Sequence, residues 1–419
     1  MISALTLLLT ADCNLRCEYC YANSKQRLHM DWATLHAALD FGLTWGQPGV
    51  KLIFSGGEPL LQFPMIERAV AYVKDSAPSH AQPMFVLLTN GTLLDEGKIR
   101  FLTKNRFEVQ LSFDGVAKAQ NIRGAGTFDA LDRLLATLAL RHRDFLRRHV
   151  KVSMTVTPRT VGSMADSVRY FLRRGVERIA IAPSLTDCSG WRPGRDGELR
   201  REFERVSRAS LSHHRRTGKI PVLMFGGRDD GRNPTGTRFT WIPGLSMSMC
   251  GIVRGEKLTV DADGEVSACV TLAGSYQRPR SALLREAVEA AHLGNVRSRS
   301  TVKRLTRRDE RAGGGHSIFS TGPVCPEIFL AKEDKRSSYR SCRKCRYFTL
   351  CLVCPVSIAH AKGRRDPRRI PDFECAFNFA AASQWEAFRK EVSSPPVRPV
   401  SESRPQPCRQ ARVTGKRRR

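Results

Sequence analysis

The stretch Leu5-Thr-Leu-Leu-Leu9-Thr-Ala-Asp-Cys13-Asn-Leu-Arg-Cys17-Glu-Tyr-Cys20 joins an apolar run directly to three cysteines. The run is short and continuous, which is typical of a strand buried on both faces of a parallel sheet. Because the cysteines follow at once, they lie on the loop at the C-terminal end of that strand. The sequence therefore predicts a buried first strand with three thiols on its following loop.

The first half of the chain alternates segments typical of strands with segments typical of helices. Such alternation indicates parallel strands joined by right-handed crossovers. Six units fit a partial, open (β/α)6 barrel of the TIM type, in which chemistry takes place at the C-terminal ends of the strands. The predicted strands are Leu5–Leu9, Val50–Phe54, Phe85–Leu88, Val109–Phe113, Val150–Val156 and Arg178–Ala182. The predicted helices are Trp32–Trp45, Met65–Lys74, Asp95–Asn105, Phe128–Arg147 and Ser163–Arg174.

The second half contains loops, short strands and most of the cysteines. Arg200–Arg216 is predicted to be a polar, exposed helix, and Leu258–Val260 is expected to pair with Val266–Cys269 as a hairpin. The fold class is therefore α/β, with a small irregular cysteine-rich domain after the barrel. We expect a core barrel at residues 1–225, a linker at 226–248, the cysteine-rich domain at 249–390 and a disordered basic tail at 391–419.

Basic residues outnumber acidic ones: 69 Lys and Arg stand against 40 Asp and Glu, giving a net charge of +29. A polyanion such as RNA would suit this balance, but a solvated surface and the basic tail explain it more simply, so nucleic acid is not the favoured partner. No apolar run reaches the roughly 18 residues that favour a membrane span. The N-terminus lacks the basic region of an export signal, so we expect a cytoplasmic protein.

The 13 cysteines are closely spaced in a chain without an export signal, which favours metal ligands over disulfides. Cys13, Cys17 and Cys20 form a triad of thiolates. A 4Fe–4S cubane with three cysteine ligands keeps one iron open for a small molecule. Zinc is the alternative, but structural zinc sites use four ligands, usually as two separated pairs. The triad therefore favours the cluster.

Three further strand ends carry motifs that would share one rim with the cysteine loop. Gly56, Gly57 and Glu58 follow the second predicted strand. The glycines let the backbone approach a ligand closely, and the carboxylate can hold an ammonium group. Residues 89–92 follow the third strand and residues 112–115 end the fourth. This convergence indicates a ligand site at the mouth of the barrel.

The triad has three residues in its first gap and two in its second, with Tyr19 before the last cysteine. This pattern resembles the signature of the radical S-adenosylmethionine (SAM) superfamily, and the resemblance covers the first half of the chain. It implies that the triad holds a 4Fe–4S cluster whose open iron chelates SAM. Reductive cleavage would then give a 5′-deoxyadenosyl radical that abstracts hydrogen from the substrate. The residues that the resemblance assigns to SAM are Gly56, Gly57, Glu58, Ser112 and Arg123.

The cysteines after residue 249 form a second group. Residues 342–354 begin with Cys-x2-Cys and end with Cys-x2-Cys, which alone is balanced between a zinc knuckle and iron–sulfur ligands. With Cys250, Cys269 and Cys375 the group has seven thiols, and seven ligands suit two clusters better than one zinc. Their order resembles the SPASM extension of radical SAM enzymes, which implies two auxiliary 4Fe–4S clusters. It assigns to the first Cys250, Cys269 and Cys354, and to the second Cys342, Cys345, Cys351 and Cys375.

Two features depart from the SPASM pattern. The last gap within residues 342–354 is two residues instead of three, and no cysteine lies shortly before Cys250. The first auxiliary cluster would therefore keep an open iron or recruit Cys325. Cys188 and Cys408 have no partners by spacing. No residue is assigned as a catalytic base.

SPASM enzymes typically modify peptides or proteins, so the resemblance implies a peptide or protein substrate and a reductant such as flavodoxin or ferredoxin. Two reactions compete: a thioether or carbon–carbon cross-link in a ribosomally made peptide, and formylglycine formation by an anaerobic sulfatase maturase. In such maturases an aspartate base directly follows the second auxiliary cysteine, whereas Val270 follows Cys269 here. Cross-linking is therefore favoured. The positive charge could attract an acidic leader peptide, and no fused leader-binding domain is expected before Cys13.

Two other classes stay open. A radical enzyme that acts on RNA is supported by the net charge alone. An iron–sulfur electron carrier would not need the Gly56-Gly57-Glu58 motif, because it would not cleave SAM.

Overall fold

The computed structural model describes residues 1–24, 26–186, 190–226, 256–278, 281–306, 329, 332–351, 353–361 and 366–393. The predicted linker and the tail after residue 393 lie outside these residues. So do the predictions made for four cysteines, Cys188, Cys250, Cys325 and Cys408. Within the described ranges, no helix has the length and apolar character needed to cross a bilayer.

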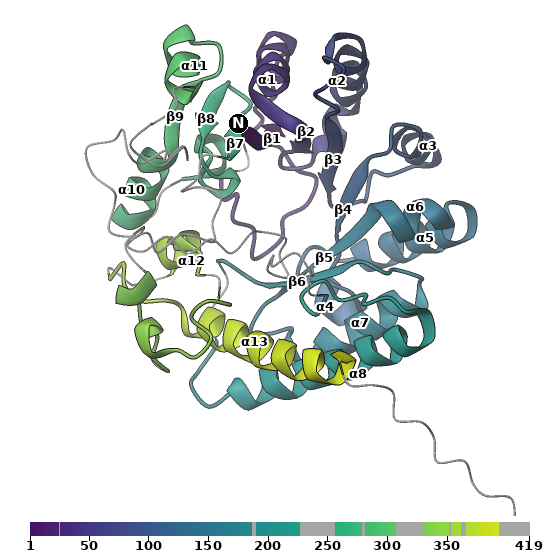
Figure 1. The fold of residues 1–419 in the computed structure, drawn as a ribbon, viewed down its shortest axis with the longest axis vertical. Coiled ribbons are helices and arrows are strands. Elements are labelled where there is room, and N and C mark those ends of the chain that lie inside the picture. Colours follow the sequence, from purple (N-terminus) through teal and green to yellow (C-terminus); the bar gives the residue numbers. More distant parts are fainter. Residues whose placement is uncertain are drawn as a thin grey trace, which may run out of the picture.

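A curved sheet organises the molecule, with its strands in the order β6-β5-β4-β3-β2-β1-β7-β8-β9 (Figure 1). Neighbours from β1 to β6 pair in parallel, each strand beside the next in the chain. This confirms the predicted partial barrel. The strands are β1 Ile2–Leu8, β2 Gly46–Ser55, β3 Met84–Thr89, β4 Glu108–Ser112, β5 Val150–Val156 and β6 Ile179–Pro183.

The crossover helices cover the outer face of this sheet (Figure 1). Asp31 caps the first of them by accepting a hydrogen bond from the Thr34 main-chain N–H at 2.7 Å. The predicted helix Phe128–Arg147 is in fact two helices. They break at His142, whose backbone is not helical and whose ring nitrogen lies 3.0 Å from Glu96 Oε1. The helices are α1 Trp32–Trp45, α2 Phe63–Ser76, α3 Glu96–Lys104, α4 Ala117–Gln120, α5 Thr127–Arg141, α6 Arg143–His149, α7 Met164–Arg173 and α8 Asp196–Thr217.

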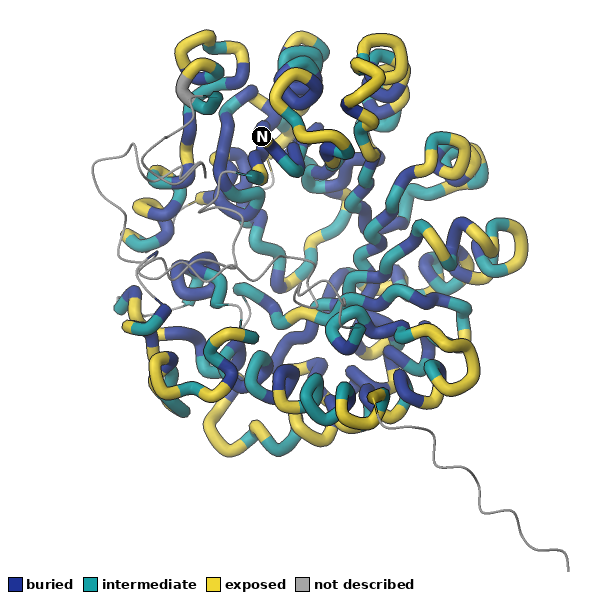
Figure 2. Tube along the Cα trace, in the orientation of Figure 1, coloured by how far each residue is buried: buried dark blue, intermediate teal, exposed yellow. Residues whose placement is uncertain are grey.

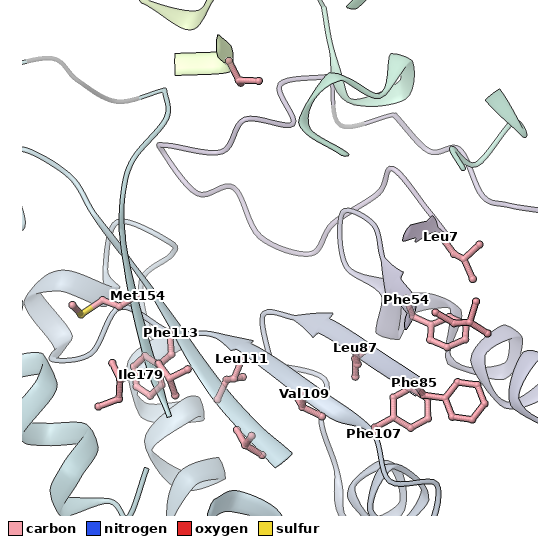
Figure 3. Close-up of a cluster of buried hydrophobic side chains, with 14 of the residues drawn as sticks. Leu7, Phe54, Phe85, Leu87, Phe107, Val109, Leu111, Phe113, Met154 and Ile179 are labelled. Carbon is pink, nitrogen blue, oxygen red and sulfur yellow. The ribbon is translucent and has the colours of Figure 1, made fainter. Parts of the chain in front are cut away.

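The core lies between the strands and these helices, and the strands are mostly buried along the arc (Figure 2). Phe54, Phe85 and Phe107 pack together under the helices (Figure 3), and the rings of Phe85 and Phe107 are stacked with centroids 5.2 Å apart. Burying each such side chain contributes about 1.5–3 kcal/mol. Because side chains alternate along a strand, the opposite set faces the inside of the arc.

The predicted hairpin is confirmed, and it extends the barrel sheet. β7 (Lys257–Val260) pairs in parallel with β1, β8 (Glu265–Ser267) pairs antiparallel with β7, and β9 (His292–Asn295) follows β8. Gly264 makes the turn with a positive φ of 89°. The sheet thus runs from the first half of the chain into the second, and the predicted domain division stays a prediction.

The C-terminal elements lie across the open side of the arc (Figure 1). α13 (Asp372–Ser393) packs against α8, where the rings of Phe203 and Phe377 are 5.0 Å apart. The prediction of an exposed helix at Arg200–Arg216 was therefore wrong for one face of α8, because α13 buries it. The remaining helices are α10 Ala282–Ala291, α11 Arg299–Thr306 and α12 Pro355–His360, with 3-10 turns at η1 Pro59–Gln62, η2 Val161–Ser163, η3 Val270–Leu272, η4 Gly274–Tyr276, η8 Lys332–Asp334 and η9 Cys342–Lys344.

Candidate active site

A cavity of about 500 Å³ opens on the inner side of the arc, at the C-terminal ends of the strands, and α13 forms its far wall. The structure brings to this one cavity every site residue predicted from the first half of the chain. They are Cys13, Cys17, Cys20, Gly56, Gly57, Glu58, Ser112 and Arg123.

The loop that carries the triad is held against the glycines after β2. The main-chain N–H groups of Gly57 and Glu58 donate to the carbonyl oxygens of Thr10 at 2.7 Å and Asp12 at 2.8 Å. A Cβ on Gly57 would lie 2.0 Å from the Asp12 oxygen, so only glycine fits there. Asp12 in turn accepts from the Cys13 N–H at 2.8 Å. The sheet therefore fixes the position of the first thiol.

The Cys13 sulfur also has hydrogen-bond donors of its own. The Leu15 main-chain N–H lies 3.4 Å from it, and the Asn90 side-chain amide lies 4.0 Å away. Donors that point at a sulfur favour its thiolate form, which is the form that binds iron. Asn90 belongs to the segment after β3, which is one of the strand ends expected to join the rim.

Glu58 is fully buried, and its carboxylate already has three donors. It accepts from Leu60 N at 3.1 Å, from Thr89 Oγ1 at 2.7 Å and from Asn90 N at 2.8 Å. A carboxylate has about four acceptor positions, so roughly one stays open toward the cavity. Burial raises the pKa of Glu58 to about 7, although these donors lower it. In this structure, the hydrogen bonds of Glu58 mainly link the end of β2 to the end of β3.

Arg123 forms a buried ion pair with Asp114. Its Nε lies 3.0 Å from Asp114 Oδ2, and its Nη2 lies 2.9 Å from Oδ1. The Tyr19 hydroxyl also donates to Asp114, and burial raises the pKa of this tyrosine. The resemblance assigns Arg123 to SAM, but its guanidinium mainly holds the triad loop to the end of β4. Ser112, the last residue of β4, lies opposite Ser153 in the sheet.

Sequence reasoning missed two further walls of the cavity. The inner face of the strands contributes polar side chains, Gln110, Ser153 and Thr155, which their alternation with buried residues in β4 and β5 could have revealed. α13 contributes one helical face with three- and four-residue spacing. Its cavity residues are Glu374, Phe377, Asn378, Ala381, Ala382 and Trp385.

Four cysteines of the second half line a separate cavity of about 20 Å³. They are Cys342, Cys345, Cys351 and Cys375, here called the quartet. The quartet has the same members as the predicted second auxiliary cluster. Cys354 lies elsewhere, in the wall of the main cavity. Cys269 has its sulfur 3.0 Å from Thr271 Oγ1.

The residues of both sites fit iron–sulfur clusters by their donor chemistry. The triad offers three thiols on one side of a cavity with room for a ligand, and the quartet offers four thiols that converge. At the quartet, the fit rests on the four thiols and not on the volume of the cavity. Among the described residues, no three His, Cys, Asp or Glu side chains are grouped to hold a single metal ion. A cubane instead binds each thiolate through a separate iron.

Known proteins resemble this chain in both sequence and fold. Residues 7–180 match the model of the Radical SAM superfamily. An uncharacterized protein of Methanocaldococcus jannaschii is 32% identical over 179 residues, which cover 42% of this chain and 61% of that protein. A cysteine-type anaerobic sulfatase-maturating enzyme of Clostridium perfringens is 27% identical over 175 residues, covering 39% of this chain and 46% of the enzyme. The matches thus span less than two thirds of either relative.

A solved structure of native anSMEcpe with bound AdoMet and the Kp18Cys peptide has the same fold. It superposes with a TM-score of 0.65 over 92% of this chain and 99% of that one, at 18% sequence identity. The cysteine loop, the glycines after β2 and the open barrel agree with the family match over residues 7–180. Through these residues, the part of the chain from 7 to 180 is similar to the radical SAM superfamily.

Proposed function

We propose that this protein is a radical SAM enzyme that modifies a peptide and carries auxiliary clusters in a SPASM-type C-terminal region. The observation that carries the proposal is the separation of two sets of thiols. The triad faces a cavity of about 500 Å³, whereas the quartet surrounds one of about 20 Å³. The first cavity has room for a small molecule beside the thiols, and the second does not.

A cluster bound to the triad would supply the electron that cleaves SAM to a 5′-deoxyadenosyl radical. The residues of the chain would bind and enclose the reactants. We propose that the rim at Gly56, Gly57 and Glu58 receives the SAM amino group, and Ser112 lines the same cavity. Apolar residues such as Phe377 and Ala381 exclude water, which protects a reactive radical. Flavodoxin or ferredoxin is the class of reductant that we propose.

The second half of the chain supports a peptide substrate. Cys354 and Glu374 line the same cavity as the triad, so the predicted auxiliary region forms part of the wall around the reaction site. The structurally similar anSMEcpe binds AdoMet and a peptide in one structure. We propose that this cavity likewise admits a peptide side chain beside SAM.

Within this class we propose a thioether or carbon–carbon cross-link as the product. A formylglycine-forming enzyme is the rival, because the Clostridium perfringens relative is a sulfatase-maturating enzyme. The position after Cys269 is Val270, which offers no base. The nearby Asp261 is buried, accepts from Ser275 N at 2.8 Å and from Ala262 N at 2.7 Å, and is not among the residues that line the cavity. These contacts favour cross-linking.

The test is to reconstitute the full chain without oxygen and supply SAM, dithionite and two kinds of peptide. One is the product of any short reading frame beside the gene, and the other is a sulfatase peptide with its target cysteine. We expect 5′-deoxyadenosine release and a cross-link in the first peptide, detected as loss of two hydrogens by tandem mass spectrometry. An aldehyde in the sulfatase peptide, trapped with a hydrazine, would instead establish the formylglycine reaction.

A further inference from the structure

Lys332 is a buried lysine beside the quartet, and no role in substrate or SAM binding accounts for it. Its side chain lines the same small cavity as the four cysteines. The residue is 7% exposed. Lysine is almost never buried to this extent without a partner of opposite charge.

The ammonium group of Lys332 has main-chain partners. It donates to the carbonyl oxygen of Cys351 at 2.6 Å and to that of Phe348, and it lies 4.4 Å from the centre of the Phe348 ring. Within the described part of the chain, no carboxylate forms an ion pair with it. Two carbonyls accept from two of its three N–H donors, and they do not neutralise its charge. The thiols of the quartet line the same cavity as this ammonium group, and Glu333 is the next residue in the chain.

A second buried lysine, Lys335, lies close to the quartet. Its main-chain oxygen accepts a hydrogen bond from the Cys342 N–H at 2.9 Å, and its ammonium group donates to the Pro367 carbonyl oxygen at 3.2 Å. The quartet therefore has two buried lysines beside it.

We propose that Lys332 sets the reduction potential of a 4Fe–4S cluster on the quartet by holding a fixed positive charge against it. This inference rests on the proposed function, which places a cluster there. With four thiolates, the oxidised cluster has a net charge of −2, and the electron that it accepts makes the charge −3. A cation at close range stabilises the more negative form and so raises the potential. Lys332 acts through the cluster and does not contact the substrate.

Three variants separate charge from packing. Lys332→Met removes the charge and keeps a long apolar side chain, and Lys332→Arg keeps the charge. Lys344→Met removes a charge from an exposed lysine in the turn Cys342–Lys344, so it is the matched control. Each full-length protein is reconstituted and titrated with dithionite at controlled potentials, followed by electron paramagnetic resonance. The signal of the quartet is the one that Cys351→Ala removes.

We expect Lys332→Met to shift the ratio of oxidised to reduced cluster about tenfold toward the oxidised form, a fall of about 59 mV for a one-electron couple. Lys332→Arg should shift this ratio by less than about twofold, because it keeps the charge. Lys344→Met should also shift it by less than about twofold, because solvent screens an exposed charge far more than a buried one. An unchanged midpoint in Lys332→Met, at full iron content, overturns the inference.

Iron content decides the outcome if Lys332→Met cannot hold its cluster. Retention of the quartet's iron by Lys332→Arg, with loss from Lys332→Met, supports a role for the charge. Loss from both variants overturns it, because packing would then be the cause. If the unmodified protein shows no signal that depends on Cys351, the proposed cluster itself is wrong, and the role of Lys332 falls with it.

Discussion

The triad and the quartet both consist of cysteines, but they line cavities of different size. The triad occupies one short loop, Cys13 to Cys20, and faces a cavity of about 500 Å³. The quartet is gathered from residues 342–375 around a cavity of about 20 Å³. A cluster on three thiols beside open space would leave an iron available to a ligand, whereas a cluster on four thiols would not. The number of thiols and the size of the cavity thus agree at both sites.

The two sites also differ in what surrounds the sulfur atoms. Main-chain and amide donors approach Cys13, and the sheet holds its loop. In the quartet, burial raises the pKa of Cys342 to about 11 and that of Cys351 to about 12. Such thiols ionise at neutral pH only when positive charge is near, as from a metal centre or Lys332. The thiols of the quartet would therefore need such a positive centre to be held as thiolates.

The largest expected effect comes from removing the triad. The variant with Cys13, Cys17 and Cys20 replaced by Ala should release no 5′-deoxyadenosine, because the iron that holds SAM would be absent. Its iron content should fall from about 12 to about 8 atoms, counting about four per cubane. Chromatography of the reaction and an iron assay measure both. Unchanged release would refute the assignment of the triad.

Replacing single cysteines of the quartet should affect peptide turnover and not SAM cleavage. Cys345→Ala and Cys351→Ala should keep much of the SAM cleavage, since the triad and its cavity are untouched, but should stop peptide turnover. Parallel assays of 5′-deoxyadenosine and of modified peptide give the ratio of SAM cleavage to peptide modification. If peptide turnover survives in both variants, the quartet has only a structural role and the contrast between the two sites loses its functional meaning.

The glycine after β2 tests how firmly the triad depends on the sheet. Gly57→Ala should displace the cysteine loop, because the new Cβ would lie 2.0 Å from the Asp12 carbonyl oxygen. We expect SAM cleavage to fall about 100-fold, as a misplacement of about 1 Å can cause. Gly274→Ala is the control, since a Cβ there has nothing within 4 Å. Equal activity in the two variants would show that the loop tolerates displacement.

The parallel strands and the triad could be predicted because each is written in contiguous sequence. Apolar residues mark the strands, in a near-continuous run in β3 and in alternation with polar residues in β4 and β5. Motifs at the ends of four strands reach one rim because parallel strands end at the same edge. The role of α13 was missed. Its face toward the cavity, from Glu374 to Trp385, is defined only by the barrel that it closes. The closed enclosure of the quartet and the burial of Lys332 likewise depend on tertiary packing.

Contacts of individual site residues were predicted less well than their position. Arg123 lines the cavity as expected, but its pairing with Asp114 could not be read from a spacing of nine residues. Glu58 was expected to face an ammonium group, and it has three donors from the chain itself. In both cases a buried charged side chain pairs with groups that tertiary packing brings close to it. Local sequence does not specify which groups these are.

The buried ion pair beside the triad should matter far more than a surface pair close to it. Arg123→Met leaves Asp114 buried without its partner, so we expect a loss of about 3–5 kcal/mol in the free energy of unfolding. Arg159→Met breaks an exposed pair with Glu18 and should cost less than about 1 kcal/mol. Urea unfolding measures both. A SAM-binding defect in Arg123→Met without loss of stability would favour a direct contact with SAM.

Two carboxylates near the thiols are buried: Glu58 after β2, and Glu374 of α13, which lines the cavity of the triad and precedes Cys375 of the quartet. Burial raises the pKa of each to about 7. Between about pH 4.5 and 7 the folded protein then binds more protons than the unfolded chain. Stability should therefore fall as the pH rises through this window, by about 3 kcal/mol for each group. Glu58→Gln and Glu374→Gln should each remove part of this slope, measured by urea unfolding at pH 5 and pH 7.5, whereas the exposed Glu67→Gln should not. If only Glu58→Gln flattens the slope, the charge of Glu374 is already compensated in the fold by the Ser357 hydroxyl, the Cys354 N–H and Lys335.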